Sequence, residues 1–264
     1  MTERVVVITG ASSGIGAALA RKLGARRDKL VLAARRKELL DRVALESKTE
    51  AFAVATDVTK RAEVERLRDR ALERYGSVDV WVNNAGRGIN KRVEELTDED
   101  IRSTIDVVLM SVVYGMQAIL PHFEERGRGH IINVSSMLGR VPFTTYRSIY
   151  SASKSAVNIL SSNARVDLRQ RYPGIMVSVV MPGIVDTPFH EIAGPGLPVR
   201  AGGSLGQARV ESADEVAEKI VGLIDNPVPE MYTSQAAQGT VSGYYADVGA
   251  FEESMAGRGQ GRRP

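Results

Sequence analysis

Short runs of apolar, largely β-branched residues recur along the chain and alternate with longer stretches in which apolar residues repeat at helical spacing. The runs show little alternation between apolar and polar positions, which is typical of strands buried on both faces of a parallel sheet. They predict strands at Val5–Thr9, Leu30–Ala34, Glu50–Ala55, Val78–Asn83, His130–Ser135 and Ile175–Met181, with Glu230–Thr233 as a candidate last strand. The stretches between them predict helices at Ile15–Leu23, Arg36–Leu45, Lys60–Tyr75, Thr97–Glu125, Tyr150–Arg171 and Ser212–Ile224.

This alternation of strand and helix predicts an α/β fold, a Rossmann-type doubly wound parallel sheet with helices on both faces. Because one sheet collects all the strands, we expect a single domain over residues 1–256. A stretch rich in Gly and Pro, 187–210, breaks the alternation, and we interpret it as a substrate lid, with a disordered insertion as the alternative. The Gly- and Arg-rich residues 257–264 are expected to form a flexible tail.

Composition and charge narrow the classes of function. The 264 residues include no cysteine, which excludes disulfides, thiolate metal sites and a cysteine nucleophile. The 35 Lys and Arg residues nearly balance the 32 Asp and Glu residues and alternate with them along polar helix faces, so we expect no nucleic-acid partner. Without an apolar stretch of ~18–20 residues or a signal peptide, the sequence predicts a cytoplasmic protein with no membrane partner. His122, His130 and His190 are not at ligand spacing, so no metal site is expected.

Two motifs at the ends of the first two strands predict a dinucleotide site. The segment Thr9–Gly16 reads TGASSGIG and opens the first helix, where glycines allow a tight turn and backbone N–H groups can approach a pyrophosphate. An acidic residue at the end of the second strand would bind the ribose of NAD, but Arg35 and Arg36 stand there instead. Two guanidinium groups suit a 2′-phosphate and favour NADP(H), the alternative being ordinary solvated arginines.

A second group of residues predicts acid/base chemistry. Tyr150 and Lys154 are four residues apart and share one helix face. A nearby ammonium group lowers the pKa of a tyrosine and makes it a usable proton donor or acceptor near neutrality. Ser136, at the end of the preceding strand, carries a hydroxyl that can bind a substrate carbonyl oxygen. Asn83–Gly86 and Pro182–Thr187 follow the fourth and sixth strands, at the sheet edge where ligands bind, and the Asn side chains can also tie strands together.

Taken together, these motifs resemble the short-chain dehydrogenase/reductase superfamily in its single-domain, NADP-preferring branch, over roughly residues 4–225: TGxxxGxG at Thr9–Gly16, NNAG at Asn83–Gly86, Ser136, YxxxK at Tyr150–Lys154 and PG…T at Pro182–Thr187. The resemblance implies that Tyr150 is the general acid/base, that Lys154 lowers its pKa and binds the nicotinamide ribose, and that Ser136 orients the substrate oxygen. It implies an NADP(H)-dependent oxidoreductase that interconverts a small-molecule carbonyl and alcohol. It also implies a homodimer or homotetramer paired through the helices Thr97–Glu125 and Tyr150–Arg171.

The resemblance assigns further residues to the cofactor. Asp57 and Val58 would contact adenine, while Ile184 and Thr187 would hold the carboxamide. The full cofactor set implied is Gly10, Ser12, Ser13, Gly14, Ile15, Gly16, Arg35, Arg36, Asp57, Val58, Asn84, Ala85, Gly86, Tyr150, Lys154, Pro182, Gly183, Ile184 and Thr187. From their positions in the chain, we expect the substrate to contact Ser136, Leu138, Tyr146 and His190, with an ordinary surface histidine as the alternative for His190.

Two departures from the family pattern bear on function. The family usually has an Asn in the long helix before the catalytic strand, where it anchors a water that relays protons to the lysine, and Val108 occupies that place. This leaves open a cofactor-binding pseudoenzyme or NADPH sensor with weak turnover, although Ser111 is a candidate to hold the water instead. The second departure is the segment Ser234–Met255, which replaces a DGG-like end and disfavours a ketoacyl-carrier reductase.

Overall fold

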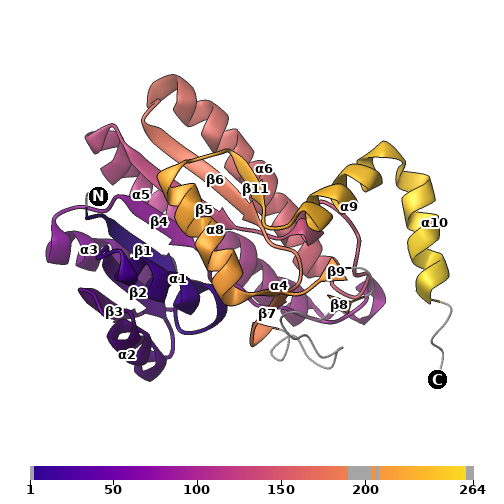
Figure 1. Ribbon diagram of the computed structural model, residues 1–264, viewed down its shortest axis with the longest axis horizontal. Helices are drawn as coiled ribbons and strands as arrows, with labels where there is room; N and C mark the ends of the chain where they lie inside the picture. Colours follow the sequence, from indigo (N-terminus) through magenta and orange to yellow (C-terminus); the bar gives the residue numbers. More distant parts are fainter. Residues whose placement is uncertain (1–2, 190–203, 206–207, 260–264) are drawn as a thin grey trace.

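Seven parallel strands form one sheet in the computed structural model, which describes residues 3–189, 204–205 and 208–259 (Figure 1). The strands are β1 (Val5–Thr9), β2 (Lys29–Ala34), β3 (Ala51–Ala55), β4 (Val80–Asn83), β5 (Gly129–Val134), β6 (Ile175–Met181) and β11 (Glu230–Tyr232). Their order is β11-β6-β5-β4-β1-β2-β3, and every neighbouring pair is parallel. The predicted doubly wound fold is confirmed, and the strand order reverses between β1 and β4, where such folds bind ligands.

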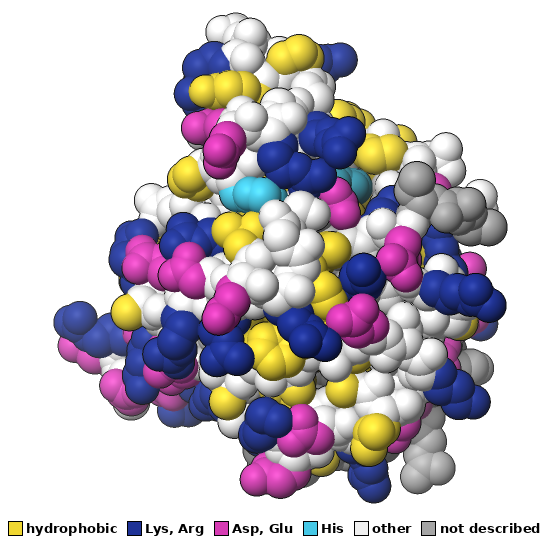
Figure 2. Space-filling view, turned by 90° about the vertical axis from the view of Figure 1, so that its left-hand side faces the viewer, with side chains coloured by type: hydrophobic (Ala, Val, Ile, Leu, Met, Phe, Trp, Pro, Cys, Tyr) yellow, Lys and Arg dark blue, Asp and Glu magenta, His cyan; other side chains and the backbone are white. Residues whose placement is uncertain are grey.

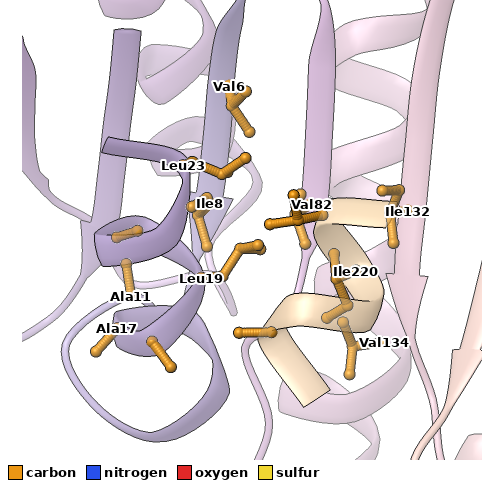
Figure 3. Close-up of a cluster of buried hydrophobic side chains, with 14 of the residues drawn as sticks. Val6, Ile8, Ala11, Ala17, Leu19, Leu23, Val82, Ile132, Val134 and Ile220 are labelled. Atoms are coloured by element: carbon orange, nitrogen blue, oxygen red, sulfur yellow. The ribbon is translucent and has the colours of Figure 1, made fainter. Parts of the chain in front are cut away.

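Helices cover both faces of the sheet, so each strand is apolar on both sides. Val6 and Ile8 of β1 face one layer, where Leu19, Leu23 and Ile220 lie over the sheet (Figure 3). Val5 and Val7 face the opposite layer. The first layer contains α1 (Gly14–Ala25), α2 (Lys37–Glu46) and α8 (Ala213–Asp225), and the second contains α3 (Arg61–Tyr75), α5 (Ser111–Arg126) and α6 (Ser148–Arg171). This double burial explains why the strands read as uninterrupted apolar runs.

The long helix predicted at Thr97–Glu125 is not continuous. It consists of α4 (Asp98–Ile105), a π-helical turn η2 (Asp106–Met110) and α5. Hydrophobic periodicity does not register this change, because a π turn adds only about one residue to an α turn. The start is typical of a helix, since Thr97 accepts a hydrogen bond from the N–H of Asp100 and η1 (Val93–Glu95) precedes it. Single π turns in α-helices occur frequently at functional sites.

The same 29 residues, Asp98–Arg126, are long and apolar enough to cross a membrane by length and composition alone. The apolar side chains of α5, among them Val112, Ile119 and Phe123, are fully buried against the sheet. A core helix of a folded domain passes the same test. On the face shown in Figure 2, acidic and basic side chains are interspersed over the surface, as the sequence pattern predicts.

The C-terminal region is helical. After β11, helices α9 (Gln235–Ala246) and α10 (Val248–Gly259) follow, and α10 extends away from the sheet (Figure 1). The helix α10 includes residues 257–259 of the predicted tail, and the tail itself stays a prediction. The rings of Phe251 in α10 and Tyr244 in α9 lie 5.3 Å apart, so the first turn of α10 packs on α9.

The predicted lid, 187–210, is described only in part. Residues 190–203 and 206–207 lie outside the described residues, and His190 is among them. Two short ladders flank the gaps: β7 (Val185–Asp186) pairs with β10 (Glu211–Ser212), and β8 (Ser204–Leu205) pairs with β9 (Ala208–Arg209). The lid therefore stays a prediction.

Candidate active site

The glycine loop between β1 and α1 lies directly against the end of β4. Gly10 has a φ of +66°, and a Cβ on it would come within 2.8 Å of the Ala85 Cα. The Thr9 hydroxyl accepts hydrogen bonds from the N–H groups of Asn84 and Ala85, at 3.1 and 3.2 Å, and the Asn84 amide donates to the Thr9 carbonyl at 3.0 Å. The close backbone approach at Gly10 and the hydrogen bonds of Thr9 and Asn84 join the two predicted motifs into one continuous surface.

The start of α1 completes a cradle that fits a pyrophosphate. The helix begins at Gly14, and the side chain of its N-cap residue, Ser13, makes no capping hydrogen bond. The first-turn N–H groups and the positive end of the helix dipole can therefore serve an anion. Thr187 lies beside this turn, its Cγ2 3.2 Å from the Cβ that Gly14 would carry. The predicted Pro182–Thr187 motif thus meets the glycine loop.

The two arginines after β2 are exposed beside the same loop. Arg36 donates from Nη2 to the hydroxyls of Ser12, at 3.1 Å, and Ser13, at 3.4 Å. Guanidinium and hydroxyl groups together offer several donors to phosphate oxygens. This end of the loop is equipped for a second anionic group beyond the pyrophosphate.

The end of β3 contributes Asp57 and Val58. The backbone N–H and hydroxyl of Thr59 donate to Asp57 Oδ1, at 3.1 and 2.8 Å. Burial raises the pKa of Asp57, but these hydrogen bonds and nearby positive charges, including Arg35, outweigh it and hold the pKa below its usual range. Asp57 therefore stays ionised, and its carboxylate is oriented by Thr59 beside the arginine pair.

A buried polar network links the sheet to the helix that carries the candidate catalytic residues. The Asn83 amide donates to Asn133 Oδ1 at 2.9 Å, and the Asn133 amide donates to the Ser161 hydroxyl at 2.8 Å. Trp81 Nε1 donates to Asn83 Oδ1 at 2.8 Å. The prediction that the Asn side chains tie neighbouring strands together is confirmed, and the network also fixes α6 on the sheet.

Ser136 stands two residues beyond β5, at the N-cap of the 3₁₀ turn η3 (Met137–Gly139), close to the strand end where the sequence places it. Its hydroxyl accepts a hydrogen bond from the Leu138 N–H at 3.1 Å. The turn presses against α6, because a Cβ on Gly139 would come within 2.8 Å of the Lys154 carbonyl carbon. This close approach brings the serine next to the tyrosine of α6.

Ser136, Tyr150 and Lys154 come together at the carboxyl edge of the sheet, and all three are buried. Tyr150 shares a hydrogen bond with the Ser136 hydroxyl. Lys154 Nζ donates to the Val134 carbonyl at 2.7 Å and lies 5.8 Å from the centroid of the Tyr150 ring. The arrangement places a phenol, a hydroxyl and an ammonium group around one point.

Burial governs the ionisation of this cluster. Burial raises the pKa of Tyr150, against the lowering effects of Arg147 and of the Ser136 hydrogen bond. Burial also lowers the pKa of Lys154 to about 8. In the protein without ligand, burial therefore outweighs the lowering effects of Arg147 and Ser136, and the lowering of the Tyr150 pKa by Lys154 stays a prediction.

Val108 stands at the position of the family's relay residue, and its side chain is surrounded by apolar groups. It is fully buried in η2 and belongs to one cluster with Ile89 and Tyr150, so the valine seals one side of the tyrosine. Ser111, the candidate replacement, donates its hydroxyl proton to the Val107 carbonyl of its own helix at 2.7 Å. The Ser111 hydroxyl proton is therefore already bonded within the π turn and is not donated to a relay water.

Sequence reasoning missed two residues beside Tyr150. The Arg147 guanidinium carbon lies 5.9 Å from the centroid of the Tyr150 ring and 5.0 Å from that of Phe189. The Phe189 and Tyr150 rings are 5.4 Å apart. The only available signal was the position of Arg147, three residues before Tyr150, which places it one helical turn away.

The predicted substrate residues differ in how deeply they are buried. Leu138 is partly buried and contacts the apolar clusters on both sides of η3. Tyr146 is 40% exposed, and its contact with the substrate stays a prediction. The loop after β6 is held close by, since the Met137 N–H donates to the Pro182 carbonyl at 3.0 Å and the Glu211 N–H donates to the Ile184 carbonyl at 2.8 Å.

Comparison with known proteins agrees with this site. The family described as short chain dehydrogenase matches residues 4–195. An uncharacterized oxidoreductase of Staphylococcus epidermidis is 31% identical over 225 residues, which cover 85% of this chain and 92% of that protein.

Two solved structures show the same fold with bound dinucleotides. A short-chain dehydrogenase/reductase from Burkholderia phymatum in complex with NAD has a TM-score of 0.84 and 28% identity, covering 94% of this chain and 95% of the other. An alcohol dehydrogenase from the archaeon Thermococcus sibiricus, complexed with 5-hydroxy-NADP, has a TM-score of 0.74 and 33% identity, covering 88% and 96%. The matched family, the relative and the shared architecture agree with the motifs and the assembled site, and the chain belongs to the short-chain dehydrogenase/reductase superfamily of oxidoreductases.

Proposed function

We propose that this protein is an NADP(H)-dependent oxidoreductase that interconverts a carbonyl and an alcohol by hydride transfer, with Tyr150 as the general acid/base. The observation that carries the proposal is the buried group of Ser136, Tyr150 and Lys154 next to a glycine cradle. A phenol beside a hydroxyl and an ammonium group can hold a carbonyl oxygen and give it a proton. The substrate is a small molecule with such a carbonyl or alcohol.

The choice of NADP(H) rests on the region around Arg36. Its guanidinium group already bridges the hydroxyls of Ser12 and Ser13, so three donor groups meet where a 2′-phosphate would bind. Arg35 adds a second exposed charge, and no acidic residue ends β2. The two structural relatives are complexed with NAD and with 5-hydroxy-NADP, so the fold accepts either kind of cofactor. The residues around the adenosine ribose then determine which cofactor binds more tightly.

Ser136, Tyr150 and Lys154 have different roles in the proposed reaction. Ser136 donates to the substrate oxygen and sets its position against Tyr150. Tyr150 gives its phenolic proton to that oxygen in reduction and takes it back in oxidation. Lys154, held by the Val134 carbonyl, supplies positive charge that favours the phenolate. When bound, the nicotinamide supplies or accepts the hydride, and the cradle of Gly10, Gly14 and Thr187 fits its pyrophosphate.

The alternative function is that of an NADPH-binding sensor with weak turnover. Val108 favours it, because a buried valine packed on Tyr150 offers no polar group to a proton relay. The alternative keeps the whole cofactor site and differs only in the rate of the chemical step. Cofactor binding alone does not separate the two.

We further propose a homodimer or homotetramer formed through α4, α5 and α6. Ile159 and Val166 of α6 are 62% and 64% exposed, and large apolar side chains at this exposure favour an interface. Light scattering at several protein concentrations would measure the assembly. A monomer at all concentrations would contradict this part of the proposal.

The test of the function is a panel of aldehydes, ketones and alcohols assayed with all four cofactor forms. We expect carbonyl-dependent consumption of NADPH, with NADH much less effective. Tight NADPH binding without turnover on any member of a broad panel would favour the sensor. Turnover with NADH alone would contradict the assignment of the cofactor.

A further inference from the structure

Arg147 is a buried cation beside the acid/base residue, and the family motifs that identify the site do not include it. Its side chain is among the buried charged groups, with 7% of the residue exposed. It stands at the N-cap of α6, where the helix dipole is positive and a cation is unfavourable. A buried guanidinium within reach of a catalytic side chain changes that side chain's electrostatic environment.

The backbone and the side chain of Arg147 serve different purposes. Its N–H donates to the Thr144 carbonyl, its carbonyl accepts from Ser151, and a β-bridge joins it to Lys91. These backbone contacts anchor the start of α6 and would survive substitution of the side chain. The guanidinium group lies over the rings of Tyr150 and Phe189, at 5.9 and 5.0 Å from their centroids.

We propose that Arg147 is a positioning residue that stabilises the phenolate of Tyr150 and acts together with Lys154 in the acid/base step. The proposal rests on the proposed role of Tyr150. In reduction, the substrate carbon gains a hydride, its oxygen gains the phenolic proton, and Tyr150 is left as a phenolate until it recovers a proton from water. A second cation beside the ring stabilises that phenolate, because charges interact strongly where water is excluded.

The groups that face Tyr150 come from several elements. Lys154 and Arg147 supply positive charge from α6, and Ser136 supplies a hydrogen bond from the end of β5. Tyr146 is close enough to Arg147 to act on the charge of its guanidinium group, and 40% of Tyr146 is exposed. The apolar side chains packed around Tyr150 are Ile89, Val108, Leu96, Leu138, Ile149 and Phe189, which exclude water and strengthen both charge interactions.

The two cations behave differently as pH rises. Lys154, with a pKa of about 8, loses its charge in alkaline solution. Burial lowers the pKa of Arg147 as well, but an arginine starts from 12.5 and keeps its charge over the working range. Arg147 is therefore the cation that remains beside Tyr150 under the alkaline conditions that favour alcohol oxidation.

The test measures the ionisation of Tyr150 without using activity. The phenolate absorbance of each protein is titrated with pH, and the curve of the same protein carrying Tyr150→Phe is subtracted. Arg147→Met should raise the midpoint for Tyr150 by about one pH unit or more, and Arg147→Lys, which keeps a charge, should raise it less. Arg165→Met is the matched control. Arg165 is a partly buried arginine of the same helix, α6, and it donates to the Val177 and Pro229 carbonyls, far from Tyr150.

The pH profile of kcat/KM gives the second readout. For alcohol oxidation, the pH at which kcat/KM rises should shift to higher values in Arg147→Met, together with the Tyr150 midpoint. It should stay unchanged in Arg165→Met. An unchanged midpoint in folded Arg147→Met would overturn the proposal, and Arg147→Gln carries the same expectation if the methionine variant does not fold. Full turnover by Tyr150→Phe would instead overturn the proposed function, while the absorbance titration would still decide the role of Arg147.

Discussion

The two sides of the site are built in different ways. On the cofactor side, Gly10 lies against Ala85 with no room for a side chain, and the charged groups Arg35 and Arg36 are exposed to water. On the catalytic side, Tyr150 and Lys154 are buried. Burial raises the pKa of Tyr150 and lowers that of Lys154, so it favours the neutral form of each. The first side depends on backbone shape and on surface charge. The second depends on how desolvation and neighbouring charges balance, which makes it far more sensitive to substitution of a single buried group.

The largest effect is expected from Tyr150→Phe, which keeps the ring in its apolar cluster and removes the proton donor. Turnover should fall by ~10²–10⁴-fold, as is usual when a general acid/base is lost. The dissociation constant of NADPH should change little, because the cradle is untouched. Tyr146→Phe, at an exposed position four residues earlier, is the control and should retain activity. A Tyr150→Phe protein as active as the wild type would place the proton donor elsewhere.

The cofactor side is tested by replacing both Arg35 and Arg36 with Ala. NADPH affinity should drop about ten- to a hundredfold, because one charge-assisted bidentate contact contributes roughly 1.5–3 kcal/mol. NADH affinity should stay nearly constant, and calorimetric titration with both cofactors measures the two. Arg42→Ala, an exposed arginine further along α2, should change neither. Equal affinity of the wild type for NADH and NADPH would contradict the predicted preference.

A pair of glycines tests whether backbone shape governs the cofactor side. Gly10→Ala should cost about 1–3 kcal/mol of unfolding free energy and weaken NADPH binding, because the residue has a positive φ and its Cβ would meet Ala85. Gly222→Ala in α8, where a Cβ meets nothing within 4 Å, should stabilise by up to ~1 kcal/mol. Chemical denaturation and calorimetry measure both. Similar results for the two variants would mean that close packing at Gly10 is unimportant.

Lys154→Met tests the cost of the buried charge. The pKa of Lys154 is about 8 in the folded protein against 10.5 in the unfolded chain, so stability falls as pH drops from 10.5 to 8 and stays reduced below 8. The free energy of unfolding of the variant should therefore be about 3 kcal/mol higher than that of the wild type at pH 7, and this gain should disappear above pH 10.5. Lys37→Met, a surface lysine paired with Asp41, should change stability little. A Lys154→Met protein less stable at pH 7 would mean that the bond to Val134 outweighs desolvation.

The smallest effect is expected from Val108→Asn. An amide at this position can hold a water for the relay, so kcat should rise a few-fold, while the apolar surroundings should cost about 1–3 kcal/mol of stability. Val108→Ala creates space without an amide and serves as the control. If the alanine variant gains as much as the asparagine variant, added space and not a relay explains the change.

Much of this molecule could be predicted from sequence. The strands β1 and β6 have the predicted bounds, and the glycine loop, the Asn83 network and the grouping of Ser136, Tyr150 and Lys154 are found where the motifs place them. Such features leave a local signal: an apolar run, a glycine where the backbone approaches closely, or a fixed spacing of polar residues.

The remaining features depend on contacts between distant segments. The direction of the Tyr150 pKa shift follows from burial by η2, η3 and Phe189, and the roles of Arg147 and Val108 follow from what they touch. The π turn at Asp106–Met110 and the extension of α10 to Gly259 also escape pattern analysis, because neither alters the apolar spacing enough to be recognised. A sequence pattern names a residue, and only the packing shows which charges it faces.

The central claim is that this site transfers a hydride to a carbonyl carbon while its own residues protonate the oxygen. The most direct test uses NADPH deuterated at nicotinamide C4, on each face in turn, with the best carbonyl substrate from the panel, followed by mass spectrometry of the alcohol. We predict that the alcohol carries the deuterium from one of the two labelled forms, and that the amount formed drops to near background with Tyr150→Phe. Alcohol that contains no deuterium from either form, or no alcohol at all, would contradict the account.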